Sequence, residues 1–181
     1  MKYTVKRTAV LACAALMIGS VSLAASTPKV QAMGLPNPIV TYDTYESVVK
    51  DAGFTPLYLT RDAGFSCYYL SLIGKNTADI GFQRCFQRLG QPETTVRVRT
   101  MPQKADKSIK DISGIYSVTW KDQVIDGVTV SIAKISDTSY AAHWKVGDYQ
   151  FSAQATGMSA PEFKALLENS LVDDSAHYFV K

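Results

Sequence analysis

Four arginines are the residues of this sequence best equipped for binding chemistry. A guanidinium is permanently charged and offers several hydrogen-bond donors, which suits it to carboxylate and phosphate groups. The four lie on consecutive runs of alternating polar and apolar residues, so we expect them at the rim of a sheet. With an outward-facing Tyr69 they form a candidate binding site, although a solvated edge that resists aggregation is the plainer interpretation. The candidate binding residues are Arg84, Arg88, Arg97, Arg99 and Tyr69.

Two cysteines, Cys67 and Cys85, form a second candidate pair. They flank two strand-like runs that are separated by a Gly-Lys-Asn turn. If Leu72 pairs with Ile80, the apolar residues share one face and Cys67 falls directly opposite Cys85, which predicts a cross-strand disulfide. A shift of one residue would split the apolar face, whereas a shift of two residues would not. Two free thiols are therefore the alternative.

Catalytic and metal-binding patterns are absent from the sequence. His143 is expected on the solvated side of a strand and His177 in a polar tail, and neither has further ligands at metal-binding spacing. No zinc-protease motif, nucleophile elbow, phosphate-binding loop or dinucleotide fingerprint occurs. We therefore expect no cofactor, no metal and no enzymatic activity. A hydrolase that uses an unrecognised pair of carboxylates is the alternative that the 16 acidic residues leave open.

The first 32 residues have the order of a secretory signal. Three basic residues lie within the first seven, an apolar stretch follows over 8–25, and small residues lead to Ala32. We expect cleavage after Ala32, which leaves 33–181 as a single domain with no stable membrane span. Retention of the apolar stretch as an anchor and lipidation at Cys13 are the alternatives.

Removal of this signal changes the charge of the chain. The full sequence carries 19 basic and 16 acidic residues, a formal net charge of +3. The signal contains four of the basic residues and no acidic residue, so 15 basic residues remain against 16 acidic ones. The resulting net charge of −1 gives no support for nucleic-acid binding.

The pattern along the rest of the chain predicts how these side chains are positioned. A capping box that begins at Asp43 starts one helix, and a second box at Ser159 starts another helix with an apolar face. Between them lie strand-like runs, and a polar tail follows from Asp173. For the hairpin around Asp126-Gly127 we prefer a three-residue loop with a glycine bulge, because a two-residue turn would place apolar residues beside Lys121 and Gln123. The predicted strands are 64–73, 77–87, 94–100, 115–125, 128–135, 140–146 and 149–155.

These elements predict an α+β fold. We expect an antiparallel sheet of about six or seven strands, with a helix near each end of the mature chain packed on it.

The order of segments resembles a known group of domains. The strongest part is a W-x-x-G-x-Y-x-F-S run from Trp144 to Ser152, followed by Gly157, Met158 and Glu162. The chain is similar to a family of uncharacterised secreted domains from Firmicutes, and similar domains form the extracellular end of anti-sigma-factor-like membrane proteins. The resemblance implies a fold and an extracytoplasmic location. It carries no catalytic residues, because the shared positions are a turn, core aromatics and a helix cap.

These observations favour a secreted, non-enzymatic binding or interaction module. Its expected partner is a cell-envelope polymer or an envelope protein, contacted through the sheet face or the arginines. A small-ligand carrier whose sheet curves round an apolar cavity is the alternative, beside the hydrolase described above.

Overall fold

The computed structural model describes residues 38–179, apart from 75, 88, 91 and 106–107. The predicted secretory signal, 1–32, therefore lies outside the described residues. Within the described ranges, no helix is long and apolar enough to cross a membrane.

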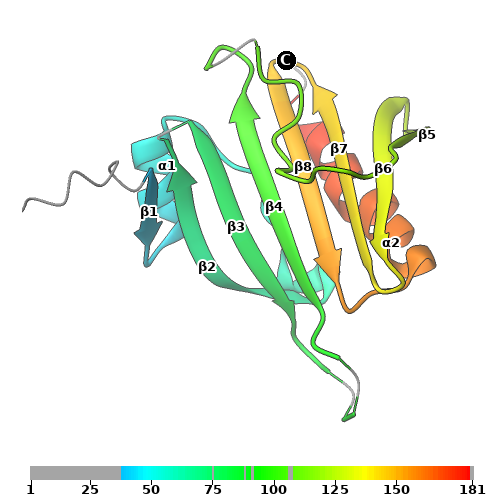
Figure 1. Ribbon diagram of the computed structural model, residues 1–181. Helices are drawn as coiled ribbons and strands as arrows, with labels where there is room; N and C mark the ends of the chain where they lie inside the picture. The colour runs from blue at the N-terminus through cyan, green and yellow to red at the C-terminus, as the bar shows by residue number, and fades with distance from the viewer. Residues whose placement is uncertain (1–37, 75, 88, 91, 106–107, 180–181) are drawn as a thin grey trace, which may run out of the picture. The chain divides into compact units, whose positions relative to one another are not determined.

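One antiparallel sheet of eight strands forms the centre of the fold, in the order β1-β2-β3-β4-β8-β7-β6-β5 (Figure 1). Across the sheet, β1 to β4 lie side by side in sequence order. The second half continues from β4 in reverse order, from β8 to β5, so that β4 pairs with β8. The α+β class is confirmed, but the strand count of six or seven was too low, because 39–42 pairs with β2 as a further strand. The strands are β1 Ile39–Tyr42, β2 Phe65–Ile73, β3 Thr77–Arg84, β4 Thr95–Pro102, β5 Lys121–Ile125, β6 Val128–Ser136, β7 Ser139–Val146 and β8 Tyr149–Thr156.

Helices cover one face of this sheet, which we call the helix face (Figure 1). Helix α1 lies behind β1 to β3, and the C-terminal helical stretch lies behind β6 to β8. Apolar side chains that alternate along the strands meet them there, including Phe82, Trp144 and Phe151. The helices are α1 Tyr45–Ala52, α2 Ala160–Leu166, a π-helical turn Leu167–Leu171 and α3 Val172–Tyr178, with a short 3-10 turn at Arg61–Ala63.

The opposite face, called the outer face, is crossed by the long connection from β4 to β5 (Figure 1). Two side chains of the sheet hold this connection. Arg99 Nη1 donates hydrogen bonds of 2.9 Å to the carbonyl oxygens of both Ile112 and Ser113. Gln150 Nε2 donates to the carbonyl oxygen of Ile109 at 2.8 Å. The connection is thus fastened to both strands of the β4–β8 pair.

Helix α1 begins one residue later than the predicted cap. Thr44, rather than Asp43, is the N-cap, because its hydroxyl accepts a hydrogen bond of 3.2 Å from the amide of Ser47. Gly53 ends the helix in the left-handed region. The second capping box is present, and Glu162 Oε2 accepts from the amide and the hydroxyl of Ser159.

The polar tail predicted from Asp173 is wrong. The chain continues as helix α3, and Val172 and Ser175 of this helix are buried. Trp144 Nε1 donates to Ser175 Oγ at 2.9 Å, so a serine hydroxyl supplies the partner that a buried indole requires. The contact fixes the end of the chain to the helix face.

The predicted register of the β2–β3 hairpin is also wrong. Leu70, rather than Leu72, pairs with Ile80, which is the two-residue shift that the apolar pattern allows. A β-bulge at Tyr68 then brings Cys67 opposite Phe82 instead of Cys85. Both cysteines are free in the structure, and burial raises the pKa of the Cys67 thiol.

Candidate functional site

A two-residue turn places polar side chains on the helix face of the edge strand. Asp126 and Gly127 both have positive φ, 51° and 79°, which suits the tight turn of a two-residue hairpin. Lys121 therefore pairs with Ile132, and the predicted bulge at Gly127 is absent. Because side chains alternate, Lys121 and Gln123 lie on the same face as Ile132. That face carries apolar core elsewhere in the sheet.

A bulge at the far end of β6 adds two further side chains. The register shifts between Lys134 and Ser136, so that Ile135 is the extra residue. Lys134 pairs with Tyr140, which puts it on the helix face too. Its ammonium contacts Asp137 Oδ1 at 2.8 Å, and this hydrogen bond raises the pKa of Lys134.

Helix α2 supplies the facing wall. The capping box at Ser159 fixes where the helix begins, and Pro161 occupies its first turn, where no donor is lost. Phe163 points inward and its ring stacks on Tyr140, with centroids 5.9 Å apart and planes 21° apart. Lys164 follows on the exposed side and contacts Glu168 Oε1 at 3.4 Å.

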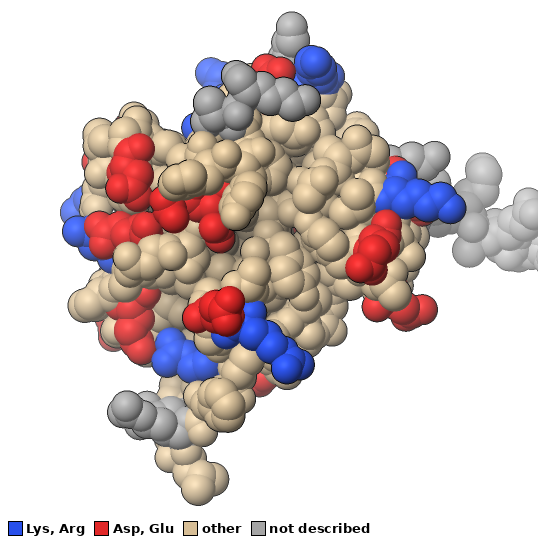
Figure 2. Space-filling model, turned by 180° about the vertical axis from the view of Figure 1, so that it is seen from behind, with Lys and Arg blue, Asp and Glu red and all other residues tan. Residues whose placement is uncertain are grey.

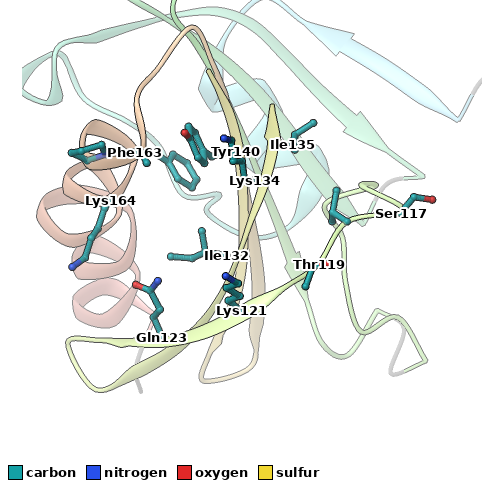
Figure 3. A pocket seen from close by; sticks show the side chains of 13 residues that line it. Ser117, Thr119, Lys121, Gln123, Ile132, Lys134, Ile135, Tyr140, Phe163 and Lys164 are labelled. Atoms are coloured by element: carbon teal, nitrogen blue, oxygen red, sulfur yellow. The ribbon is translucent and has the colours of Figure 1, made fainter. Parts of the chain in front are cut away.

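Together these elements enclose a pocket of about 730 Å³, which we call the edge pocket (Figure 3). Its size lies within the range of small-molecule sites. The buried rings of Tyr140 and Phe163 form its floor with Ile132. In Figure 3, Lys164 and Gln123 extend toward one end, whereas Lys134 lies beside Tyr140 at the other. The lining residues are Ser117, Val118, Thr119, Lys121, Gln123, Ile132, Lys134, Ile135, Tyr140, Ala160, Pro161, Phe163 and Lys164.

The electrostatics of the edge pocket are one-sided. Three lysines line it and no acidic residue does. Asp137 and Glu168, which pair with two of these lysines, lie outside the lining. Lys121 forms no ion pair with any residue of the described part of the chain. The pocket therefore combines an apolar floor with a positively charged rim.

The predicted arginine site has a different organisation. Asp79 is buried in β3, and its Oδ1 lies 3.3 Å from Arg99 Nε and 3.6 Å from Arg97 Nε. Tyr69 donates its hydroxyl hydrogen to the same oxygen at 3.1 Å and accepts from Arg97 Nε at 3.0 Å. Burial, followed by the charge of Asp79, raises the pKa of Tyr69. The structure thus brings Arg97, Arg99 and Tyr69 together around an internal carboxylate.

A glycine makes room for this cluster. The Tyr69 ring lies over Gly81 on the neighbouring strand, where an added Cβ would sit 2.0 Å from Cε1 of the ring. The position requires glycine because of this close approach. Tyr68, its neighbour, is the more exposed of the two tyrosines, at 53%.

The remaining predicted residues do not join this cluster. Arg84 pairs with Glu162 at 3.3 Å and lies over the Phe65 ring, while Arg88 falls outside the described residues. His143 lies on the outer face with its ring edge against Trp120, and His177 contacts Asp173 on helix α3. On the helix side of the molecule, basic and acidic side chains are scattered over a larger uncharged surface (Figure 2).

The residues of the edge pocket were missed at the sequence level, although a signal for them exists. Asp-Gly is a strong signal for a two-residue turn. Counting back from it places Lys121 and Gln123 beside apolar residues. That register conflicts with the alternation of polar and apolar residues, and such a local conflict is itself a pointer to a functional surface.

Comparison of the chain with family models, with curated proteins and with solved structures finds no match. The resemblance to secreted domains of Firmicutes therefore stays a prediction. Among the residues that the structure describes, no group of three or more His, Cys, Asp and Glu side chains could hold a metal ion.

Proposed function

We propose that this protein is a non-enzymatic binding module that acts outside the cytoplasmic membrane and holds a small ligand in the edge pocket. The observation that carries this proposal is the set of polar side chains on the helix face, Lys121, Gln123 and Lys134, around an apolar floor. Exposed lysines also protect a sheet edge against pairing with other chains, so it is their combination with an enclosed apolar floor that supports a binding role. The proposed location depends on the signal-like order of 1–32.

The arginines are a weaker basis for a binding surface. Arg84, Arg97 and Arg99 each pair with an acidic residue of the fold, as Lys134 and Lys164 of the edge pocket do, whereas Lys121 forms no ion pair within the described residues. An external anion would have to compete with Asp79 or Glu162. This comparison supports the carrier over the envelope-polymer surface.

Nile red, an uncharged dye that fluoresces in apolar surroundings, tests the proposal. We expect the purified protein to increase its fluorescence. Ala160→Trp should abolish the increase, because Ala160 lines the pocket and the indole fills it. Ala165→Trp is the matched control, on an exposed position of the same helix outside the lining. Equal dye binding by the two variants would contradict the proposed site.

A further inference from the structure

We infer that the ligand of the edge pocket is an anionic amphiphile, a molecule with one apolar chain and a carboxylate or phosphate head. The inference rests on the proposed function, because it assumes that the pocket is occupied, and it adds the chemical class of the occupant.

The expected negative charge of the ligand follows from the lysines at the rim of the pocket. Three lysines and no acidic residue line the pocket, and although Asp137 and Glu168 pair with Lys134 and Lys164 from outside the lining, the charge of Lys121 remains for an anion to balance. Of the three lysines, Lys121 is the best candidate to bind the anionic head group, because it forms no ion pair within the described residues. Gln123, two residues along the same strand face, adds an amide that can donate to an oxygen of the head group.

The apolar part of the ligand follows from the floor. The fold already covers most of Phe163 (1% exposed) and Tyr140 (8%), so the apolar area open to a ligand chain comes mainly from Ile132, Ile135 and Val118, which are half-buried or exposed. The Tyr140 hydroxyl donates to the carbonyl oxygen of Asp137, so its polar atom is already satisfied and its ring face remains for apolar contact. A chain lying over Ile132 and Ile135 would exclude water from these side chains.

The two ends of the pocket orient the ligand. Lys121, Gln123 and Lys164 gather donors at one end, and Ile135 lies toward the other end, where the ammonium of Lys134 is already paired with Asp137 (Figure 3). The head therefore lies between β5 and α2, and the chain runs toward the β6 bulge. A free anion would bind the hydrogen-bond donors but make no apolar contacts. A neutral lipid would make the apolar contacts but leave the lysine charges unbalanced.

The test compares ten-carbon probes below their micelle concentrations by calorimetric titration of the purified protein. The probes are decanoate, decyl phosphate, decyltrimethylammonium and decanol, with inorganic phosphate alone as a fifth. We expect the two anionic amphiphiles to bind and the other three to bind at least about tenfold more weakly. Backbone amide shifts in a ¹⁵N spectrum should locate decanoate at Gln123 and Ile132.

Charge variants sharpen the test. Lys121→Glu should weaken decanoate binding by about tenfold, because it replaces an attraction at the rim by a repulsion. Lys145→Glu is the control, since it makes the same change at an exposed lysine of β7 outside the lining. Circular dichroism checks that both variants fold.

The outcomes separate the two proposals. If decanol or decyltrimethylammonium bound as tightly as decanoate, with shifts at the pocket, the anionic class would be wrong and the proposed function would stand. If inorganic phosphate bound as tightly as decyl phosphate, the apolar chain would contribute nothing to binding and the ligand would not be an amphiphile. If no probe bound and Nile red also failed to bind, the proposed function itself would fall.

Discussion

A single buried carboxylate organises the outer face at the scale of the residue. Asp79 gathers Arg97, Arg99 and the Tyr69 hydroxyl around one oxygen, and Ser71 donates its hydroxyl to the Asp79 carbonyl at 3.0 Å. Arg99 also donates to the β4–β5 connection. The Asp79 carboxylate therefore positions the side chain that joins the sheet to the segment crossing its outer face. Its contribution is structural.

We expect Asp79→Asn to lower the free energy of unfolding by about 3 kcal/mol, because it leaves two guanidiniums without their carboxylate, one of them largely buried. Asp122→Asn is the control, at an exposed carboxylate on the edge strand, and should change stability by less than about 0.5 kcal/mol. Urea unfolding followed by circular dichroism measures both. Equal effects would remove the special role of Asp79.

A second residue-scale prediction concerns alkaline pH. Burial, with smaller effects of Tyr58 and Glu46, raises the pKa of Tyr45 to about 12, and its hydroxyl donates to the Pro56 carbonyl. The folded state therefore keeps the proton where the unfolded chain begins to lose it, near pH 10. By linkage, the stabilisation is complete below pH 10 and is lost as the pH rises from 10 to about 12.

Tyr45→Phe should consequently reduce the fall in the urea midpoint between pH 9 and pH 11. Tyr116→Phe, at a tyrosine 86% exposed, should leave that fall unchanged. Tyr69 also has a raised pKa, so part of the fall should remain in Tyr45→Phe. The explanation fails if Tyr45→Phe and the unmodified protein lose stability in parallel.

At the scale of the element, helix α1 gives a direct test of the revised cap. Thr44→Ala should lower the free energy of unfolding by about 1 kcal/mol, because the amide of Ser47 loses its acceptor. Asp43→Ala should be close to neutral, although the sequence pattern selects Asp43 as the cap. Thermal melts of the two variants decide between them, and a larger loss for Asp43→Ala would restore the original prediction.

The sequence predicted the elements better than their registers. The hairpin of β7 and β8 and the second helix start at Ser159 are confirmed, because alternation and caps are local signals, while the first helix start was one residue off. The β2–β3 register was missed because a two-residue shift keeps every apolar side chain on its face. The bulge at Tyr68 depends on the space over Gly81, a contact between strands that no local pattern encodes.

The candidate site was less predictable than the fold. Arg97 and Arg99 alternate with the buried Val96 and Val98 along β4, as a half-buried strand requires, but no local pattern distinguishes their partner Asp79 among the 16 acidic residues. The edge pocket requires helix α2 to approach β5 and β6, a tertiary arrangement. The expectation that one face of a strand carries only apolar residues led away from the correct turn at Asp126-Gly127, because the exposed Lys121 and Gln123 share a face with Ile132.

At the scale of the whole molecule, the β4–β8 pairing joins two four-stranded halves into one sheet. The same core cluster contains Phe82 and Val98 of the first half and Trp144 and Phe151 of the second. We therefore expect both halves to unfold in one cooperative transition.

Val98→Ala tests this expectation. Val98 is 1% exposed on β4, and its truncation should cost about 2 kcal/mol. The tryptophans, both in the second half, should report the same shift in urea midpoint as far-ultraviolet circular dichroism. Val124→Ala, at a valine 73% exposed on β5, is the control and should shift neither. Separate midpoints for the two probes would show that the halves unfold independently.

The pairing of β4 with β8 also sets an order of events during synthesis. A ribosome makes β4 first, and its partner strand follows only after the 46 residues between Pro102 and Tyr149. Throughout that interval the nascent chain carries the hydrogen-bonding edge of β4 without its native neighbour. An unpaired edge of this kind invites pairing with other chains. The edge of β4 therefore stays open to such pairing until β8 has been made and occupies it.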